Sequence, residues 1–160
     1  IRHIPLPPPQ PPVWRLRTKR VIDVVGALVG IALSVPIVAL LGVLIRLESP
    51  GAVLFAQTRV GRDGRPFRCY KLRTMRRDAE RVLEEDHALR AMYEGNAFKV
   101  PAHLDRRITP LGRVLRATSL DELPQFWNVL RGDMSLVGPR PIVPTELVHY
   151  EDTQETLLSV

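Results

Sequence analysis

Cysteine is nearly absent from this sequence, and aromatic residues are sparse. The 160 residues contain a single cysteine, Cys69, which excludes an internal disulfide and a cysteine-rich zinc site. Phe, Trp and Tyr together make up 6% of the chain, which is few for a protein that stacks nucleobases on aromatic rings. The histidines are isolated and lack the spacing of metal ligands. These absences argue against a disulfide-rich, a zinc-binding and a base-stacking protein.

Long strand-like runs are also few, so a large β-sheet is not expected. The residue patterns predict a β-hairpin, with strands at residues 52–56 and 67–72 and a turn at Asp63-Gly64. A further short strand and several helices are predicted, the strand at 134–137 and the helices at 77–94, 111–116, 121–130 and 146–158. The predicted fold class is therefore α+β and mostly helical, with short helices and one β-hairpin.

Basic residues outnumber acidic ones. The chain has 23 Lys and Arg against 17 Asp and Glu, which gives a formal charge of +6 and a pI of about 10.2. Such an excess fits nucleic acid, anionic lipid headgroups or phosphorylated substrates as partners. Composition alone does not choose among them.

The strongest physical signal is an apolar run at residues 24–45, which holds no charged residue. It is apolar on all sides and long enough for a membrane helix by the criterion of about 20 residues. A buried helix of a soluble protein is the alternative, although 160 residues offer little core to surround one. Trp14, Lys19 and Arg20 precede the run, a combination typical of the membrane–water interface.

Two features favour a re-entrant helix over one that spans the membrane. Pro36 removes a backbone donor and should kink the helix, and Ser34 can donate to a carbonyl that the proline frees. Cations flank both ends of the run, with Lys19 and Arg20 before it and Arg46 after it. A straight span would place positive charge on both sides of the membrane, whereas a bent helix returns both ends to one face.

Two adjacent carboxylates, Asp121 and Glu122, lie in the sequence SLDELPQ at residues 119–125. Arginines precede and follow them. An arginine binds phosphate oxygens bidentately, and a carboxylate can hold a divalent cation or attack phosphorus. The stretch suggests a phosphate site whose basic neighbours would favour an ionised Asp121. A capping box, with Ser119 as the N-cap residue and Glu122 as its partner, is an alternative compatible with that site.

Four motifs together resemble the bacterial sugar transferase family. They are KRVID at residues 19–23, YKLRTM at 70–75, SLDELPQ at 119–125 and GDMSLVGPRP at 132–141. Each is weak alone, but their order behind an apolar helix with an internal proline is specific. The resemblance covers about residues 15–150. Members of this family are monotopic polyprenyl-phosphate phosphoglycosyl transferases, which start the assembly of capsule, O-antigen and exopolysaccharide.

The resemblance implies an enzyme of the bacterial inner (cytoplasmic) membrane, with its catalytic domain on the cytoplasmic face. A sugar 1-phosphate would move from a nucleoside-diphosphate sugar, usually a UDP-sugar, to polyprenyl (undecaprenyl) phosphate through a phosphosugar–aspartyl intermediate. The family also implies Mg²⁺ as cofactor and a re-entrant helix broken at a Ser-Pro pair. Pro36 matches that proline, whereas Ser34 lies one residue earlier than the usual serine. We expect no nucleic-acid partner, and the sequence leaves an oligomer open.

The resemblance also implies roles for individual residues. By its position in the motif, Asp121 matches the family's nucleophile, and Glu122 would support the metal or the acceptor. Both carboxylates would lie near the Mg²⁺. Arg140 matches an arginine on the nucleotide side of the site. Substrate binding is expected of four basic residues in all, namely Lys71, Arg73, Arg116 and Arg140.

The expected organisation has three parts. Residues 1–18 form a proline-rich linker and basic juxtamembrane segment, 19–47 a re-entrant membrane helix, and 48–160 a catalytic domain. Family members normally continue further, so we expect the chain to be truncated at its C-terminus, and its start at Ile1 suggests a fragment or a processed piece. Two alternatives stay open: an inactive, truncated member of the family, and a membrane-tethered basic binding module that would not need Asp121.

Overall fold

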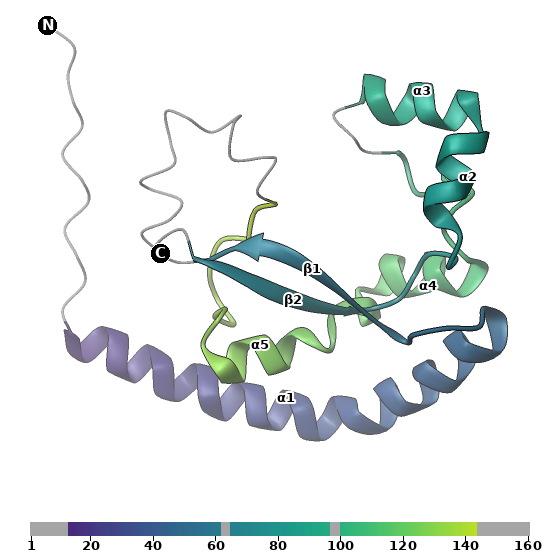
Figure 1. The fold of residues 1–160 in the computed structure, drawn as a ribbon. Coiled ribbons are helices and arrows are strands. Elements are labelled where there is room, and N and C mark those ends of the chain that lie inside the picture. The colour runs from purple at the N-terminus through teal and green to yellow at the C-terminus, as the bar shows by residue number, and fades with distance from the viewer. Residues whose placement is uncertain (1–12, 62–64, 97–99, 144–160) are drawn as a thin grey trace, which may run out of the picture. The chain divides into compact units, whose positions relative to one another are not determined.

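The computed structural model describes residues 13–61, 65–96 and 100–143. In chain order its elements are α1 (Val13–Glu48), β1 (Leu54–Val60), β2 (Pro66–Leu72), α2 (Ala79–Glu85), α3 (His87–Gly95), α4 (Pro110–Thr118), the 3₁₀ helix η2 (Leu120–Glu122) and α5 (Gln125–Arg131) (Figure 1). β1 and β2 pair in a two-stranded sheet. Over the described ranges, the predicted class, α+β and mostly helical with one hairpin, is confirmed.

The chain divides into two compact units, each assembled from separate segments. Unit 1 contains Ile1–Leu33, Ala56–Tyr70 and Gln125–Val160, and unit 2 contains Ser34–Phe55 and Lys71–Pro124. Unit 1 therefore includes all of α5, and unit 2 includes all of α2, α3, α4 and η2.

α1 is one helix of 36 residues with Pro36 inside it. Its segment Leu16–Glu48 is long and apolar enough to cross a membrane, and only 11% of its most apolar window is buried. That exposure argues against the alternative of a buried core helix. Because the helix begins at Val13, the basic juxtamembrane segment is helical from that residue onward. Pro36 does not end the helix, and the kink and the re-entrant path stay predictions.

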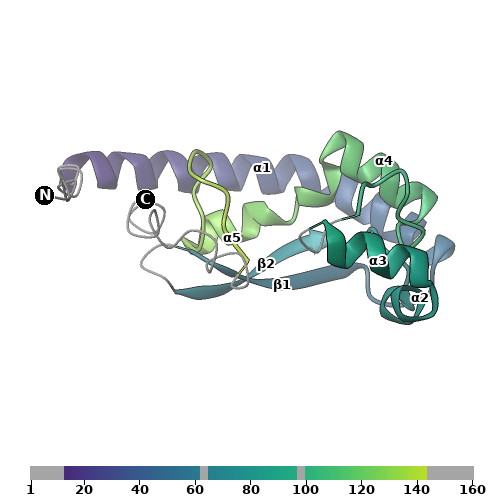
Figure 2. The same cartoon turned by 90° about the horizontal axis from the view of Figure 1, so that it is seen from above.

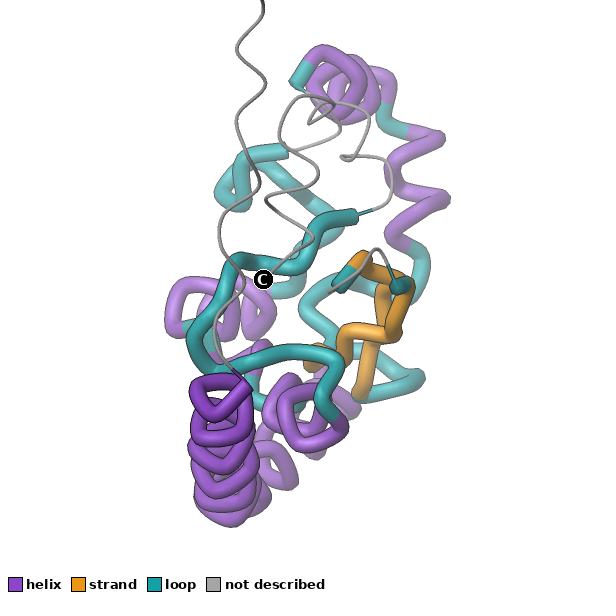
Figure 3. Tube along the Cα trace, turned by 90° about the vertical axis from the view of Figure 1, so that its left-hand side faces the viewer, coloured by secondary structure: helices purple, strands orange, loops and turns teal. Residues whose placement is uncertain are grey.

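The hairpin lies where the sequence predicts it, with a longer first strand. β1 begins at Leu54, two residues after the start of the predicted strand at 52–56, and continues to Val60, whereas β2 includes the whole predicted strand at 67–72. The two strands are drawn in orange in Figure 3. The predicted turn at Asp63-Gly64 lies outside the described residues, as does the predicted helix at 146–158.

The single helix predicted at residues 77–94 is wrong, because two helices, α2 and α3, occupy this range (Figure 2). Asp86 separates them with an extended backbone. Its carboxylate accepts a hydrogen bond of 3.0 Å from the amide of Leu89 and so caps the start of α3. An N-cap aspartate offers the chain an alternative to continuing the first helix.

The helix predicted at residues 121–130 is also wrong at its start, where η2 and a turn precede α5. Ser119 has a φ of 57°, in the left-handed region, and its side chain makes no cap hydrogen bond. The predicted capping box is therefore absent. Instead the amide of Glu122 donates to the Ser119 carbonyl at 3.1 Å, and the Glu122 carboxylate pairs with Lys71.

The strand predicted at residues 134–137 is a loop of bends. Its polar groups bond to a side chain rather than to a neighbouring strand: the Leu136 amide donates to the carboxylate of Asp23 at 3.0 Å. The predicted end of the preceding helix is confirmed. α5 ends at Arg131, and Gly132 follows with a φ of 93°, which favours glycine.

A small apolar core holds unit 2 together. Leu41 and Ile45 of α1 pack there with Leu72 of β2 and Leu115 of α4. α4 approaches the end of β2 so closely that a Cβ added to Gly112 would lie 2.1 Å from the Thr74 carbonyl oxygen. This packing fixes α4 against the end of β2, and the candidate site lies where β2 ends and where the chain leaves α4 for η2.

Candidate active site

The site of unit 2 is built around Asp121, which the turn after α4 directs into the protein. The left-handed conformation of Ser119 ends α4, and η2 then carries both carboxylates. The Asp121 side chain is 10% exposed, whereas that of Glu122 is 41% exposed. Lys71, at the end of β2, forms an ion pair with both carboxylates. Its Nζ is 2.6 Å from Glu122 Oε1 and 3.9 Å from Asp121 Oδ2.

Arg116 provides a second cation at this site. It lies in the last turn of α4, and its Nε donates to Thr74 Oγ1 at 2.9 Å. Asp121 and Asp105 both act on its guanidinium through their charge. Asp105 is held in turn by Arg107, which donates to both carboxylate oxygens at 2.8 Å. The guanidinium at position 116 is thus held by a hydroxyl, and burial lowers its pKa while the two carboxylates oppose that decrease.

The protonation of Asp121 is governed by burial. Burial raises the pKa of Asp121 above its ordinary value, while the charges of Lys71 and Arg116 act to lower it and Glu122 adds to the increase. The basic neighbours thus favour an ionised Asp121, as expected, but burial is the larger influence and the sequence analysis did not take it into account. The two cations limit an increase that burial causes.

Arg73 is not gathered with the two carboxylates. Its guanidinium donates to the carbonyls of Ile45 at 3.4 Å and Pro50 at 3.3 Å, and also to the carbonyl of Ser49. It therefore caps the C-terminal end of α1, where a cation also stabilises the helix dipole. Lys71, two residues earlier, is the basic residue of this motif that contacts Asp121 and Glu122.

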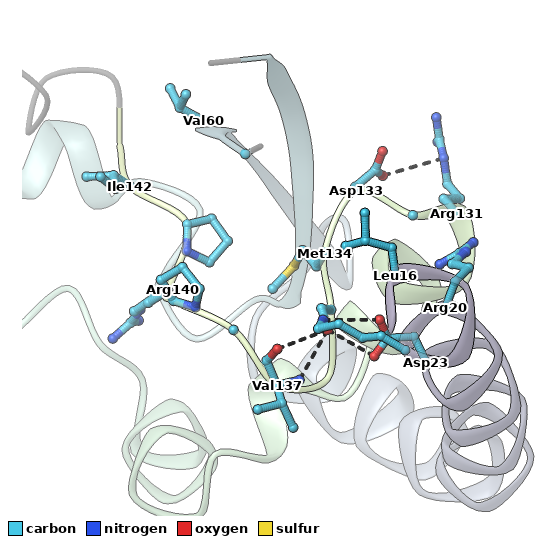
Figure 4. A pocket seen from close by; sticks show the side chains of 17 residues that line it. Leu16, Arg20, Asp23, Val60, Arg131, Asp133, Met134, Val137, Arg140 and Ile142 are labelled. Carbon is cyan, nitrogen blue, oxygen red and sulfur yellow. Dashed lines mark hydrogen bonds and ion pairs between the residues drawn. The ribbon is translucent and has the colours of Figure 1, made fainter. Parts of the chain in front are cut away.

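Arg140 belongs to unit 1, where it lines a cavity of about 270 Å³ with Lys19, Arg20 and Asp23 of α1 (Figure 4). Arg20 donates to the carbonyls of Val129 and Leu130 at 2.8 and 2.7 Å, so it caps the end of α5. Lys19 donates to Asp23 and to Ser135. The two cations predicted at the membrane interface thus bind protein groups.

The predicted membrane residue Ser34, in unit 2, is buried.

Asp23 lies in the KRVID motif, but the sequence analysis assigned it no role. Its Oδ1 accepts a hydrogen bond of 2.9 Å from Ser135 Oγ (Figure 4). It also accepts one of 3.0 Å from the Leu136 amide. It thereby ties the loop before Arg140 to α1. The available signal was a carboxylate at the start of an apolar run, where a charge is costly unless it has partners.

Asn128 is the other residue that sequence reasoning missed. It is fully buried on α5, accepts from the Tyr70 amide at 3.0 Å and donates to the Arg68 carbonyl at 2.7 Å. Its side chain also donates to Asp133 at 3.1 Å. Its side chain bonds to the backbone of β2 as a neighbouring strand would, and so joins α5 to β2. An asparagine within a helix gives no local signal of such pairing.

The capacity of the site for a metal ion is limited to two carboxylates. In the described part of the chain, no group of three or more His, Cys, Asp or Glu side chains could hold a metal. Asp121 and Glu122 still fit Mg²⁺, which protein sites often bind through one or two carboxylates, with waters and substrate phosphates completing the shell.

The arrangement of a buried aspartate, a second acid and two cations suits chemistry at phosphorus, and a comparison with known proteins identifies the family. A model described as bacterial sugar transferase matches residues 14–159. The chain belongs to this family. The resemblance seen in the four sequence motifs is therefore confirmed.

Three relatives illustrate the match. Galactosyl transferase CpsE of Streptococcus agalactiae is 45% identical over 90% of this chain. UDP-glucose:undecaprenyl-phosphate glucose-1-phosphate transferase of Caulobacter vibrioides is 50% identical over 77%, and undecaprenyl-phosphate galactose phosphotransferase of Salmonella typhimurium is 44% identical over 84%. The matches span 31%, 41% and 28% of these relatives' own lengths, so the chain corresponds to a part of each.

Proposed function

We propose that the protein transfers a sugar 1-phosphate from a UDP-sugar to undecaprenyl phosphate, in the first membrane step of glycoconjugate or exopolysaccharide synthesis. The observation that carries the proposal is the buried Asp121 beside Lys71 and Arg116, in a chain of the bacterial sugar transferase family. The names of two relatives specify undecaprenyl phosphate, and one of them specifies UDP-glucose.

The proposed reaction has two displacements at one phosphorus atom. First, a carboxylate oxygen of Asp121 attacks the phosphorus that bears the sugar. The bond from this phosphorus to the bridging oxygen of the diphosphate breaks, and its electron pair leaves with UMP. Then a phosphate oxygen of undecaprenyl phosphate attacks the same phosphorus, the aspartyl bond breaks, and the carboxylate is regenerated. Both nucleophiles are anions, so neither step needs a base.

The neighbours of Asp121 have separate tasks in this scheme. Lys71 and Arg116 balance the negative charge of the diphosphate and favour the ionised form of Asp121. Arg140 would bind the nucleotide side of the substrate. Mg²⁺, held by Asp121 and Glu122, would supply further charge neutralisation to the diphosphate.

We also propose that α1 enters one leaflet of the inner membrane from the cytoplasmic face and returns to that face. Cations at both ends of the apolar run support this path, because Lys19 and Arg20 precede it and Arg46 follows it. Pro36 lies within the run, where it can bend the helix. The acceptor is a lipid, and this placement would bring it to a catalytic domain on the cytoplasmic side.

The test is turnover by the purified chain in detergent with Mg²⁺, undecaprenyl phosphate and a panel of UDP-sugars. The quantity measured is the rate of UMP release. Asp121→Asn should lower the rate at least about 10³-fold, because the nucleophile is lost. Glu85→Gln removes a carboxylate that is 68% exposed on α2 and should leave the rate unchanged. Equal rates for the two variants would contradict the proposal. The absence of transfer by the parent chain would favour one of the two alternatives, an inactive, truncated family member or a membrane-tethered binding module.

A further inference from the structure

A basic groove of unit 2 contains none of the residues assigned to catalysis. It has a volume of about 920 Å³ and lies between the end of α1, the start of α2 and the start of α4. Five arginines line it: Arg76, Arg77, Arg81, Arg106 and Arg113. A cluster of guanidinium groups around one cavity is the arrangement that binds phosphate oxygens, because each group can donate two parallel hydrogen bonds.

The two carboxylates of the groove are already engaged. Glu48 Oε1 accepts a hydrogen bond of 3.0 Å from the Leu111 amide, at the start of α4. Asp78 accepts from Arg76 and from Arg81, each at 3.1 Å. They therefore offset only part of the positive charge, and the groove keeps an excess of cations.

Arg77 and Arg113 contribute the uncompensated charge. Both are exposed, and neither forms an ion pair with another residue of the described ranges. Arg106, by comparison, has a carboxylate 3.5 Å away in Asp86. Arg77 and Arg113 are therefore the groups that an anion entering the groove would meet without displacing a protein partner.

The position of the groove along the chain identifies the kind of anion. Glu48, Ser49 and Pro50, which line it, directly follow the apolar helix α1, and the Leu47 side chain before them is 78% exposed. If α1 lies in the membrane, the groove opens at the depth of the lipid headgroups. This step rests on the membrane placement of α1 proposed above.

We propose that this groove binds the phosphate of an anionic membrane phospholipid, with Arg77 and Arg113 as its principal ligands. The bound headgroup would hold unit 2 at the membrane surface. The site differs in residues and in role from the one that contains Asp121. Lipid binding in the groove does not depend on catalysis at Asp121.

The test is native mass spectrometry of the full chain released from a neutral detergent, titrated with phosphatidylglycerol or with phosphatidylcholine. The parent chain should retain phosphatidylglycerol in preference to phosphatidylcholine. Arg77→Gln with Arg113→Gln should weaken phosphatidylglycerol binding roughly 25-fold, since each arginine near an anionic surface contributes about fivefold. Arg65→Gln with Arg68→Gln removes the same charge from exposed positions on and beside β2 and should have little effect.

Several results would overturn the inference. Unchanged phosphatidylglycerol binding in the Arg77 and Arg113 variant would exclude the groove, and an equal loss in the Arg65 and Arg68 variant would mean attraction by net charge alone. Displacement of the lipid by millimolar inorganic phosphate would indicate a site for free phosphate instead. UMP release is measured on the same samples. Its absence from the parent chain would count against the transferase, whereas the lipid titration tests the groove.

Discussion

At the scale of single residues, Asp121 and Glu122 show how neighbouring acids acquire different chemistry. The first side chain is 10% exposed and the second 41%, and the same lysine contacts both. Burial raises the pKa of Asp121, and Lys71 and Arg116 oppose that increase. A partly desolvated carboxylate is the stronger nucleophile, provided that its cations keep it ionised at working pH.

This balance predicts the pH dependence of the first displacement. Only ionised Asp121 can attack, so activity should fall on acidification at a higher pH than for an aspartate of ordinary pKa. Lys71→Gln removes the cation 3.9 Å from Asp121 Oδ2, so the pKa should rise and the acidic limb should move to still higher pH. The measurement is single-turnover UMP release against pH. Lys71→Arg keeps the charge and should restore the limb, and an identical limb in Lys71→Gln would refute the assignment.

At the scale of elements, close contacts between segments distant in sequence position the functional loops. Gly112 lets α4 approach the residues that follow β2, and Asp23 of α1 holds the loop that leads to Arg140. Neither contact lies at a reacting atom. Each determines where a charged side chain stands, so each should affect activity through structure.

Gly112→Ala should destabilise the protein by about 1–3 kcal/mol, because the new methyl group would meet the Thr74 carbonyl in a packed contact. The carbonyl belongs to the backbone and cannot swing aside as a side chain can. Chemical denaturation in detergent measures the change in the free energy of unfolding. Gly95→Ala is the matched control, since a Cβ there meets no atom within 4 Å, and its stability should be equal or higher. Similar values for the two variants would disprove the close approach.

Asp23→Ala should release the loop at residues 132–141. The substitution removes the acceptor of the Ser135 hydroxyl and of the Leu136 amide and should cost about 1–3 kcal/mol. Hydrogen exchange should become faster in this loop and stay unchanged in α4, which belongs to unit 2. Ser135→Ala removes one of the two donors and should have a smaller effect. A loop that stays fully protected in Asp23→Ala would show that the carboxylate does not hold it.

At the scale of the whole molecule, the path of α1 decides how the protein would meet the proposed lipid acceptor. The proposed re-entrant helix predicts that both of its ends face the cytoplasm. Cysteines introduced as Thr18→Cys and Leu47→Cys should both react with an impermeant maleimide in inside-out vesicles and not in right-side-out vesicles. The native Cys69 is 2% exposed and should give little background. Labelling of the two positions from opposite sides would show that the helix spans the membrane.

Much of this architecture could be predicted because its signals are local. The apolar run predicts α1, the alternating strands predict the hairpin, and Pro110 at the first turn agrees with a short helix there. Asp121 and Glu122, with Lys71 and Arg116, could be selected from the motifs, and these four residues are gathered in unit 2.

The remaining features depend on partners far away in sequence. The capping box fails because Glu122 pairs with Lys71 rather than with Ser119, and that pairing exists only once β2 lies beside η2. The strand at 134–137 fails because Asp23 takes the Leu136 amide. Arg73 caps the end of α1, a contact that its motif does not signal, and its role as a substrate ligand stays a prediction. In the first two cases a tertiary hydrogen bond outweighs the local pattern.

The central claim, that Asp121 forms a covalent bond to the phosphosugar, is tested most directly by intact-protein mass spectrometry. The chain would be incubated with Mg²⁺ and one UDP-sugar at a time, without undecaprenyl phosphate. We predict a mass increase of one sugar phosphate with the correct sugar, its absence in Asp121→Asn and its loss when undecaprenyl phosphate is added. UMP release and transfer to lipid without any such adduct, or the same adduct in Asp121→Asn, would contradict the account.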